Sequence, residues 1–434
     1  MAKLPLEGIR VATIGVVWAG PFAGQLLADW GSEVIRVESL HHFTILTRGF
    51  PGIRPSKELV RSRKTWSTAY PDWDPGEKPW NRFPIFQAHA RNKLSCTMDL
   101  IKPKGVELFK KLAAKCDIVI ENNPPETMKK IGITYDTLKP IKPDIIMISM
   151  AGYGCTGPYR NYRALGANLD EAAGHTWLRR YRDMDPSSAS RILFSDATAG
   201  AHAAFAALAA LRYRNRTGKG QFIDLSQVET LMPYLADAIM DYTMNHRVQD
   251  TMGNRHPFMA PHGCYRCKGE DRWVVIAINK QQEWRALCRI MERADLESDE
   301  RFADALSRCR NQNDLDPLIE QWTVQNDPIE IMNRLQKAGI AAGAVLDDRD
   351  AYMDPHLRDR NFFQKVTHPD AGTHIYPGIM WKASKTPNAI RLPPVCLGQH
   401  NAYVYKEILG VSDKEYAKLE KEGHIGTEPA PEAL

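Results

Sequence analysis

The chain has 434 residues, of which 43% are hydrophobic and 25% are charged, and its formal net charge at pH 7 is +5. These values are typical of a folded protein with large cores, and no block of like charges indicates a nucleic-acid-binding arm. No apolar run is long enough to cross a membrane, and the N-terminus lacks the pattern of a secretory signal. We therefore expect a cytoplasmic enzyme with no nucleic-acid or membrane partner.

The first predicted elements form a β–α–β unit. Residues 8–17 predict a buried strand, residues 22–30 carry apolar side chains at helical spacing, and residues 33–38 predict a second strand. Such a unit implies a parallel sheet with a ligand near the carboxyl ends of its strands. The turn after the first strand, AGPFAG, does not match the GxGxxG pattern, and this excludes a nicotinamide oxidoreductase.

The region 40–92 is long, irregular and rich in aromatic residues. Connections of this length are usually functional or disordered, and the aromatic content argues against disorder. We therefore expect this region to form a packed cover or the wall of a pocket.

Strands and helices alternate again after this region. Strands are predicted at residues 94–100, 117–121, 145–150 and 221–226, and helices at residues 103–116 and 126–131. One strand ends at Asn122 and Asn123, and another ends at Ala151, Gly152 and Tyr153. Because ligands bind at strand ends in parallel sheets, both segments are candidate binding loops, although each can equally be an ordinary turn.

A short apolar run at residues 192–194, predicted as a strand, precedes Asp196 and an alanine-rich, helix-forming stretch. This change of pattern places Asp196 at or beside a helix N-terminus. There we expect its carboxylate to stay ionised, and free N–H groups nearby to stabilise a developing oxyanion. The small residues Ala197, Ala199 and Gly200 leave room for a substrate. Asp196 is thus a candidate nucleophile, although an aspartate at this position can also serve only as a structural cap.

The rest of the chain predicts a second domain. A long amphipathic helix starts at residue 227 and leads into a smaller α+β unit, so we assign residues 1–226 to a large domain and residues 227–350 to a small one. Residues 351–434 form a return segment. Cys264 and Cys267 have the spacing of half a metal site, but no second pair accompanies them, and we expect no metal.

Eight stretches of the chain carry a shared pattern in a fixed order: residues 6–38, 89–100, 120–138, 150–160, 195–226, 253–265, 338–363 and 397–410. Together they resemble the family III CoA transferases, the family that contains formyl-CoA transferase and carnitine CoA-transferase. They cover essentially the whole chain outside the region 40–88 and the C-terminal tail.

The resemblance assigns the family's aspartate nucleophile to Asp196. It places coenzyme A, as a co-substrate, against ten residues: Trp18, Ala19, Arg91, Lys93, Asn122, Asn123, Lys130, Ala151, Gly152 and Tyr153. Within this set, Arg91 and Lys93 are expected near the adenosine phosphates. Lys130 takes the place of an arginine, so it keeps the charge but loses the bidentate geometry.

The resemblance also implies a fold and a mechanism. The fold is a Rossmann-like large domain built from both chain ends, with a smaller α+β domain inserted, and two subunits interlock as rings in a homodimer. The implied reaction moves CoA from an acyl-CoA donor to a carboxylic acid through an aspartyl anhydride and an aspartyl-CoA thioester. Residues 253–263 replace a glycine-rich loop of formyl-CoA transferase. His256 and His262 are therefore candidate pocket residues, although a histidine near a loop is more often structural.

Three points stay open at this stage. An acyl-CoA racemase of the same fold has a histidine where this chain has Leu165, which disfavours racemisation unless Asp170 or His175 substitutes. A non-catalytic subunit of a mixed CoA-transferase complex is expected to lose the nucleophile, which this chain keeps. The aromatic side chains between residues 66 and 86, with Trp18, can bind a bulky or aromatic acid or a carnitine-like cation, or can simply pack the insertion.

Overall fold

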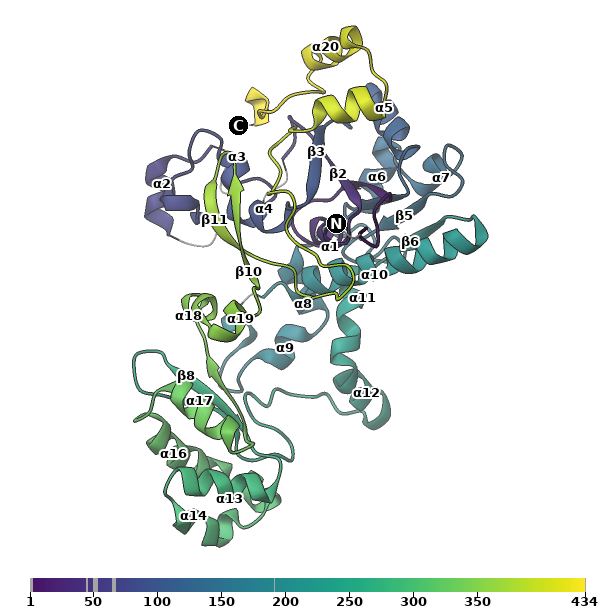
Figure 1. The fold of residues 1–434 in the computed structure, drawn as a ribbon. Helices are drawn as coiled ribbons and strands as arrows, with labels where there is room; N and C mark the ends of the chain where they lie inside the picture. Colours follow the sequence, from purple (N-terminus) through teal and green to yellow (C-terminus); the bar gives the residue numbers. More distant parts are fainter. Residues whose placement is uncertain (1–2, 44–45, 50–53, 65–67, 191, 434) are drawn as a thin grey trace. The chain divides into compact units, whose positions relative to one another are not determined.

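The computed structural model describes residues 3–43, 46–49, 54–64, 68–190 and 192–433, and Figure 1 shows the order of the elements. By its contacts the chain divides into two compact units. The first comprises Met1–His175, Ser190–Arg247 and Asp359–Leu434, and the second comprises Thr176–Ala189 and Val248–Arg358. The predicted domain boundaries differ from this division, because residues 227–247 group with the first unit and residues 176–189 with the second. 

A six-stranded parallel sheet lies at the centre of the first unit. Its strands are β1 (Arg10–Ile14), β2 (Glu33–Glu38), β3 (Lys93–Thr97), β4 (Ile118–Glu121), β5 (Ile146–Ser149) and β6 (Gln221–Asp224). Their order is β3-β2-β1-β4-β5-β6, with every pair parallel. The connection order reverses between β1 and β4, and ligand crevices in such sheets open at the carboxyl ends of the strands beside this reversal. The α/β class and the parallel sheet expected from the sequence are confirmed.

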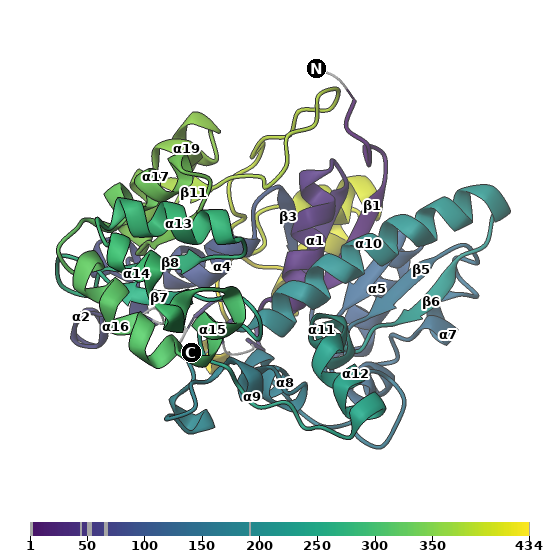
Figure 2. The ribbon, with the colours of Figure 1, turned by 90° about the horizontal axis from the view of Figure 1, so that it is seen from below.

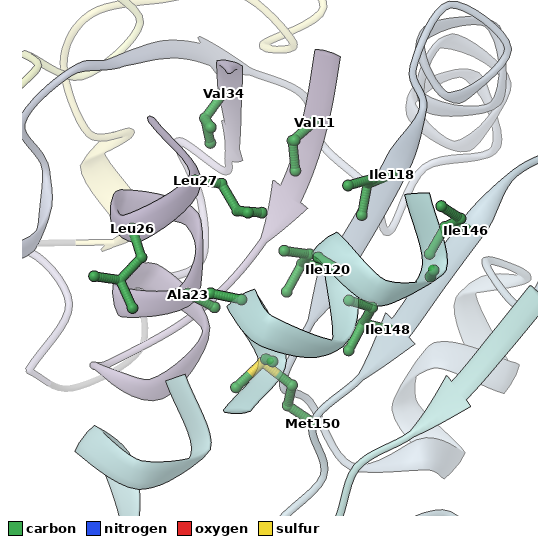
Figure 3. Packing of buried hydrophobic residues seen from close by; sticks show 14 of the residues in the cluster. Val11, Ala23, Leu26, Leu27, Val34, Ile118, Ile120, Ile146, Ile148 and Met150 are labelled. Atoms are coloured by element: carbon green, nitrogen blue, oxygen red, sulfur yellow. The ribbon is translucent and has the colours of Figure 1, made fainter. Parts of the chain in front are cut away.

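Helices α1 (Ala19–Asp29) and α10 (Phe194–Thr217) cover one face of this sheet, as Figure 2 shows. Apolar side chains of the strands, among them Val11, Ile120 and Ile148, point toward these two helices in Figure 3. The small residues of α10 allow this helix to approach α1 closely. At Gly200 even a Cβ atom would lie only 2.7 Å from the ring of Phe22 in α1. The alanine-rich sequence therefore brings the N-termini of the two helices together.

The opposite face of the sheet is covered by α5 (Pro103–Ala113) and by the C-terminal part of the chain. Phe109 of α5 is fully buried in the same apolar cluster as Tyr405 and Leu419, the latter from α20 (Asp413–Lys421). An ion pair of 3.2 Å between Lys104 and Glu415 also joins α5 to α20. The two ends of the chain thus form one core.

The aromatic region contains α2 (Lys57–Arg63), α3 (Pro79–Arg82) and α4 (Pro84–His89). The guanidinium of Arg48 is fully buried, donates to Glu38 at 2.7 Å, and lies 3.7 Å from the ring centre of Phe86. Trp80 is also fully buried. Tyr70, Trp80, Phe83 and Phe86 therefore pack the region, whereas Trp73 is exposed. Trp66 lies outside the described residues.

The second unit has its own sheet and core. Its antiparallel sheet has the order β7-β8-β9, with β7 at His262–Arg266, β8 at Trp273–Ala277 and β9 at Ala341–Val345. Trp284 and Phe302 are fully buried in its apolar cluster. Its helices include α13 (Gln281–Ile290), α14 (Ala294–Ser298), α15 (Ala305–Arg310), α16 (Gln312–Thr323), α17 (Pro328–Lys337) and α18 (Asp348–Met353).

The remaining elements are α6 (Pro125–Ile131), α7 (Tyr135–Leu138), α8 (Gly166–Ala172), α9 (His175–Arg179), α11 (Gln227–Leu231), α12 (Ala236–Asn245), α19 (Pro355–Asp359) and the hairpin β10 (Phe363–His368) and β11 (Gly372–Pro377). In the described part of the chain, the helices are all too short or too polar to cross a membrane.

Two sequence predictions near the site are wrong in detail. Residues 192–194 do not form a strand, because Leu193 adopts a left-handed φ of 52° and α10 already begins at Phe194. The long helix predicted from residue 227 is interrupted by a tighter turn at Met232–Leu235. Pro233 in this turn has no N–H to continue the helical hydrogen bonds.

Candidate active site

Asp196 lies in the first turn of α10, beside the N-terminus of α1. Its side chain is buried, and its Oδ1 accepts a hydrogen bond of 3.2 Å from the backbone N–H of Ala19. Ala19 is the first residue of α1, where the helix dipole favours negative charge. Two helix N-termini therefore meet at one carboxylate. 

Gly166, the first residue of α8, makes room for this carboxylate. A Cβ atom at position 166 would lie 1.8 Å from Oδ2 of Asp196, which no side chain can tolerate. The hydroxyl of Ser195 also donates to the carbonyl of Gly166 at 3.0 Å. These contacts hold α8 against the start of α10 and leave only glycine compatible with the observed position of Asp196.

Asp170, at the other end of α8, caps α10. Its carboxylate accepts hydrogen bonds from the backbone N–H groups of Ser195 at 2.8 Å and Phe194 at 3.1 Å, and it is 3% exposed. The N–H groups of Phe194 and Ser195 are therefore already bonded to an acidic side chain remote in sequence, as first-turn N–H groups are in capped helices. The expected role of the N–H groups after Asp196 at an oxyanion stays a prediction.

Burial raises the pKa of Asp196 to about 6, and the nearby Asp170 carboxylate adds to the increase, while the Ala19 N–H acts against it. We expected the helix terminus to keep this carboxylate ionised; loss of hydration instead moves its pKa upward. The group is still mostly ionised at pH 7. A buried, ionised carboxylate that lacks full hydration is well suited to act as a nucleophile.

Asp196 lines a cavity of about 250 Å³ at the carboxyl ends of the strands. One wall comes from the segments after β1 and β4, and the other from the segment that leads into α8. Among the predicted CoA-binding residues, four line this cavity: Asn122, Asn123, Ala151 and Gly152. A second cavity, of about 210 Å³, shares Val16 and Asn123 with the first. The two cavities are therefore adjacent at this edge of the sheet.

Asn122 and Asn123 also hold this edge together. The Asn122 side chain accepts from the Val16 N–H at 2.7 Å and donates to the Val16 carbonyl at 3.0 Å. Asn123 donates to the carbonyl of Ile14 at 3.2 Å. These bonds fix the loop after β1 to the loop after β4, so the wall of the cavity is organised without a ligand.

Arg91 and Lys93 are buried and already partnered. The guanidinium of Arg91 pairs with Asp29 at 2.8 Å and donates to the carbonyl of Pro377 at 2.6 Å. The ammonium of Lys93 donates to the carbonyls of Pro21 and His89, and burial lowers its pKa well below the ordinary value. These contacts tie both side chains to α1 through Asp29 and Pro21, and their role at the adenosine phosphates stays a prediction.

The other predicted CoA-binding residues lie around the same edge. Trp18 is the residue before α1, and its ring lies 5.0 Å from that of His89. The exposed Lys130 lines a further cavity together with Ile131, which also lines the second cavity. The ring of Tyr153 contacts Tyr159 and Tyr162.

His256 and His262 belong to the second unit. Their rings lie 5.4 Å apart, and His262 Nδ1 lies 2.6 Å from the carbonyl of Asn254. Both contacts are with residues of the same unit, so their role at the active site stays a prediction. Cys264 and Cys267 are free thiols, and no group of metal-ligating side chains occurs within the described ranges.

Sequence reasoning missed Gly166 as a neighbour of Asp196, and it missed Arg160 and Arg163, which line the same cavity. A glycine that is required by a contact about thirty residues away leaves no local pattern. The two arginines follow the Gly-Tyr-Gly segment, and their basic character is visible, but only the fold places them opposite the carboxylate-bearing helix.

Comparisons with known proteins identify the family of this chain. Residues 6–401 match CoA-transferase family III. The succinyl-CoA–D-citramalate CoA-transferase of Chloroflexus aurantiacus is 31% identical over 96% of this chain and 97% of that protein. The beta subunit of succinyl-CoA–L-malate CoA-transferase from the same organism is 30% identical, again over 96% of this chain and 97% of its own length. The crystal structure of a CAIB/BAIF family protein from Brucella suis superimposes with a TM-score of 0.80 at 29% identity, over 94% of this chain and 100% of that chain. The chain belongs to CoA-transferase family III and is an enzyme that transfers coenzyme A.

Proposed function

We propose that the enzyme moves CoA from an acyl-CoA donor to a carboxylic acid with Asp196 as the nucleophile. The observation that carries this proposal is the buried Asp196 carboxylate, which is held by Ala19 and Gly166 and lines a cavity at the switch point of the sheet. The names of the relatives support succinyl-CoA as the donor.

The proposed reaction is a double displacement. A carboxylate oxygen of Asp196 attacks the donor thioester, a C–O bond forms, the C–S bond breaks, and CoA thiolate leaves behind an aspartyl anhydride. The thiolate then attacks the Asp196 carbonyl, forms an aspartyl-CoA thioester and releases the donor acid as its carboxylate. The acceptor carboxylate reverses both steps. Because one thioester is exchanged for another, the enzyme mainly has to position its partners and exclude water.

Ala19 has a defined role in this scheme. When thiolate attacks the Asp196 carbonyl, negative charge develops on an oxygen of that same side chain. The Ala19 N–H already donates to Oδ1 at 3.2 Å, from the positive end of α1. We propose that Oδ1 becomes this oxyanion, and that Oδ2 forms the bond to the acyl group.

CoA is proposed to extend from this cavity along the edge of the sheet into the second cavity. Val16 and Asn123 line both cavities, so CoA would pass beside these two residues. Trp18, Asn122, Ala151, Gly152, Tyr153 and Lys130 remain proposed contacts. Coenzyme A acts here as a co-substrate.

We propose that the active form is a homodimer, although one relative is named as the beta subunit of its enzyme. Size-exclusion chromatography with light scattering on the protein purified alone, followed by an activity assay, tests this point. Transfer that appears only when a paralogous chain is added would indicate a heteromer.

Oxygen transfer tests the anhydride directly. In the proposed scheme, an acceptor acid labelled with ¹⁸O in its carboxylate leaves one labelled oxygen on Asp196 after each turnover. After turnover with labelled acid, we expect mass spectrometry of the peptide that contains Asp196 to show the label. Label-free Asp196 in a sample that has completed transfer contradicts the proposal.

Racemisation is not favoured by the site. Leu165 lines the cavity where a racemase carries a histidine, and Asp170 is buried and bonded to the start of α10. His175 stacks on the ring of Phe194, with centres 5.6 Å apart. A chiral 2-methylacyl-CoA incubated in deuterated water without an acceptor acid is expected to show no exchange of its α-proton.

The pH dependence of transfer follows from the pKa of Asp196. Because only the ionised carboxylate attacks, the rate is expected to fall as the pH decreases through about 6. The Asp170 charge helps to raise this pKa. Asp170→Asn, which keeps the side-chain shape, should therefore shift the acid limb of kcat/KM to lower pH. An unchanged or upward-shifted limb would contradict this electrostatic coupling, even if the variant loses stability.

A further inference from the structure

The cavity beside Asp196 contains two positive charges whose role the nucleophile does not explain. Arg160 and Arg163 line this cavity, both are exposed, and the other side chains of the wall are neutral apart from Asp196 itself. Within the described chain, Arg163 has no hydrogen-bond or ion-pair partner, and Arg160 donates only to the carbonyl of Gly157 at 3.3 Å. Both guanidinium groups are therefore available to an anion.

These arginines line only the first of the two cavities. Val16 and Asn123 line both cavities, whereas the second cavity, into which CoA is proposed to extend, contains neither Arg160 nor Arg163 in its lining. The phosphates of CoA are separated from its thioester by the whole pantetheine arm. An anion near residues 160–163 is therefore a part of the acyl group or of the acid.

Within the described chain, neither arginine forms a hydrogen bond or an ion pair with the reacting carboxylate of Asp196. Their guanidinium groups are thus available to a part of the substrate other than the carbonyl that reacts.

The segment that carries them is braced by three tyrosines. The rings of Tyr159 and Tyr162 stack with centres 4.8 Å apart, and Tyr153 contacts both at 5.8 and 6.2 Å. These ring contacts join the segment that carries the arginines to Tyr153, in the loop after β5.

We propose that Arg163, assisted by Arg160, binds the second carboxylate of a dicarboxylic acyl group and thereby determines substrate specificity. A guanidinium can donate two parallel hydrogen bonds to one carboxylate. If the acyl group ended in an apolar tail instead, the guanidinium would lose hydration without forming hydrogen bonds in return. This inference rests on the proposed function, since it assumes that the acyl group lies in the Asp196 cavity.

The test compares two donors that differ only in the remote carboxylate, succinyl-CoA and butyryl-CoA. In a double displacement, kcat/KM for the donor depends only on the first half-reaction, so the acceptor cancels. For Arg163→Gln we expect kcat/KM with succinyl-CoA to fall about tenfold or more, and kcat/KM with butyryl-CoA to stay unchanged. Arg216→Gln, at an exposed position near the end of α10, is the matched control and should affect neither.

Reversing the charge at position 163 tests the same assignment through a gain of activity, which misfolding cannot produce. Arg163→Glu should favour 4-trimethylammoniobutyryl-CoA over succinyl-CoA relative to the unmodified enzyme. An equal loss with both donors for Arg163→Gln, or no loss with either, overturns the assignment of Arg163. Absence of transfer by the unmodified enzyme with every donor would instead refute the proposed function.

Discussion

Replacing Asp196 by asparagine is expected to reduce CoA transfer by about 10⁴-fold or more, since the amide cannot form the anhydride. The substitution is close to isosteric, and the amide oxygen can still accept the hydrogen bond from Ala19. Steady-state transfer assays measure the loss, and hydroxylamine trapping should detect the acyl intermediate only in the unmodified enzyme. Asp136→Asn, at an exposed site on α7, is the control and should retain full activity.

The same variant should be more stable, which separates chemistry from misfolding. Asp196 has a pKa of about 6 in the folded protein, above its ordinary value of 3.8. The folded state therefore binds the Asp196 proton more tightly than the unfolded state does. The stabilisation from this proton is greatest below pH 3.8 and is lost as the pH rises through 6. At pH 7, removal of the buried charge should stabilise the protein by about 2–3 kcal/mol in thermal or denaturant unfolding. Substantial remaining activity, or a lower melting temperature, would contradict this account.

Gly166→Ala is expected to reduce kcat about 100-fold or more while the protein stays folded. The new Cβ would lie 1.8 Å from Oδ2 of Asp196, so either the carboxylate or α8 has to move. A displacement of about 1 Å at the reacting atom is enough for such a loss. Steady-state assays measure kcat, and a separate binding assay measures the affinity for CoA. The substitution should lower kcat and leave the affinity for CoA largely unchanged.

Gly343→Ala is the matched control for this substitution. Gly343 lies in β9, and a Cβ there would meet only a methyl group of Val275 at 3.5 Å, an ordinary contact. Full activity of Gly343→Ala together with a loss in Gly166→Ala supports the positional argument. Equal activity of the two variants would show that the carboxylate adapts to the added methyl group.

The order of strands and helices around the sheet was predictable because it depends on local periodicity. Residues 33–38 were predicted as a strand with the observed bounds, and the predicted strand at 117–121 differs by one residue from β4. The α/β class, the parallel sheet and the membership in CoA-transferase family III could also be inferred from ordered motifs. The break at Pro233 was visible in the sequence as well, but the strong amphipathic pattern around it predicted a continuous helix.

The helix-forming run after Asp196 is a local signal that marked this residue as a candidate, and the resemblance to the family then favoured a nucleophile over a structural cap. The residues that contact Asp196 in the folded chain could not be predicted in this way. Asp170 reaches the start of α10 across 25 residues, and Gly166 approaches Asp196 across about 30, and neither has a pattern that marks it. Arg91 and Lys93 carry the charges expected of phosphate contacts, and only the packed structure reveals that Asp29 and three carbonyls already accept hydrogen bonds from them.

The amino-acid sequence alone determined which carboxylate to examine and which scaffold carries it, because hydrophobic periodicity and helix boundaries are encoded within a few residues. Tertiary structure decided the state of that carboxylate. Its raised pKa arises from burial and from Asp170, and its position depends on Gly166 and Ala19. Solvation and steric exclusion depend on all the atoms around a group in space, and these come from α1, α8 and α10, which are far apart along the chain.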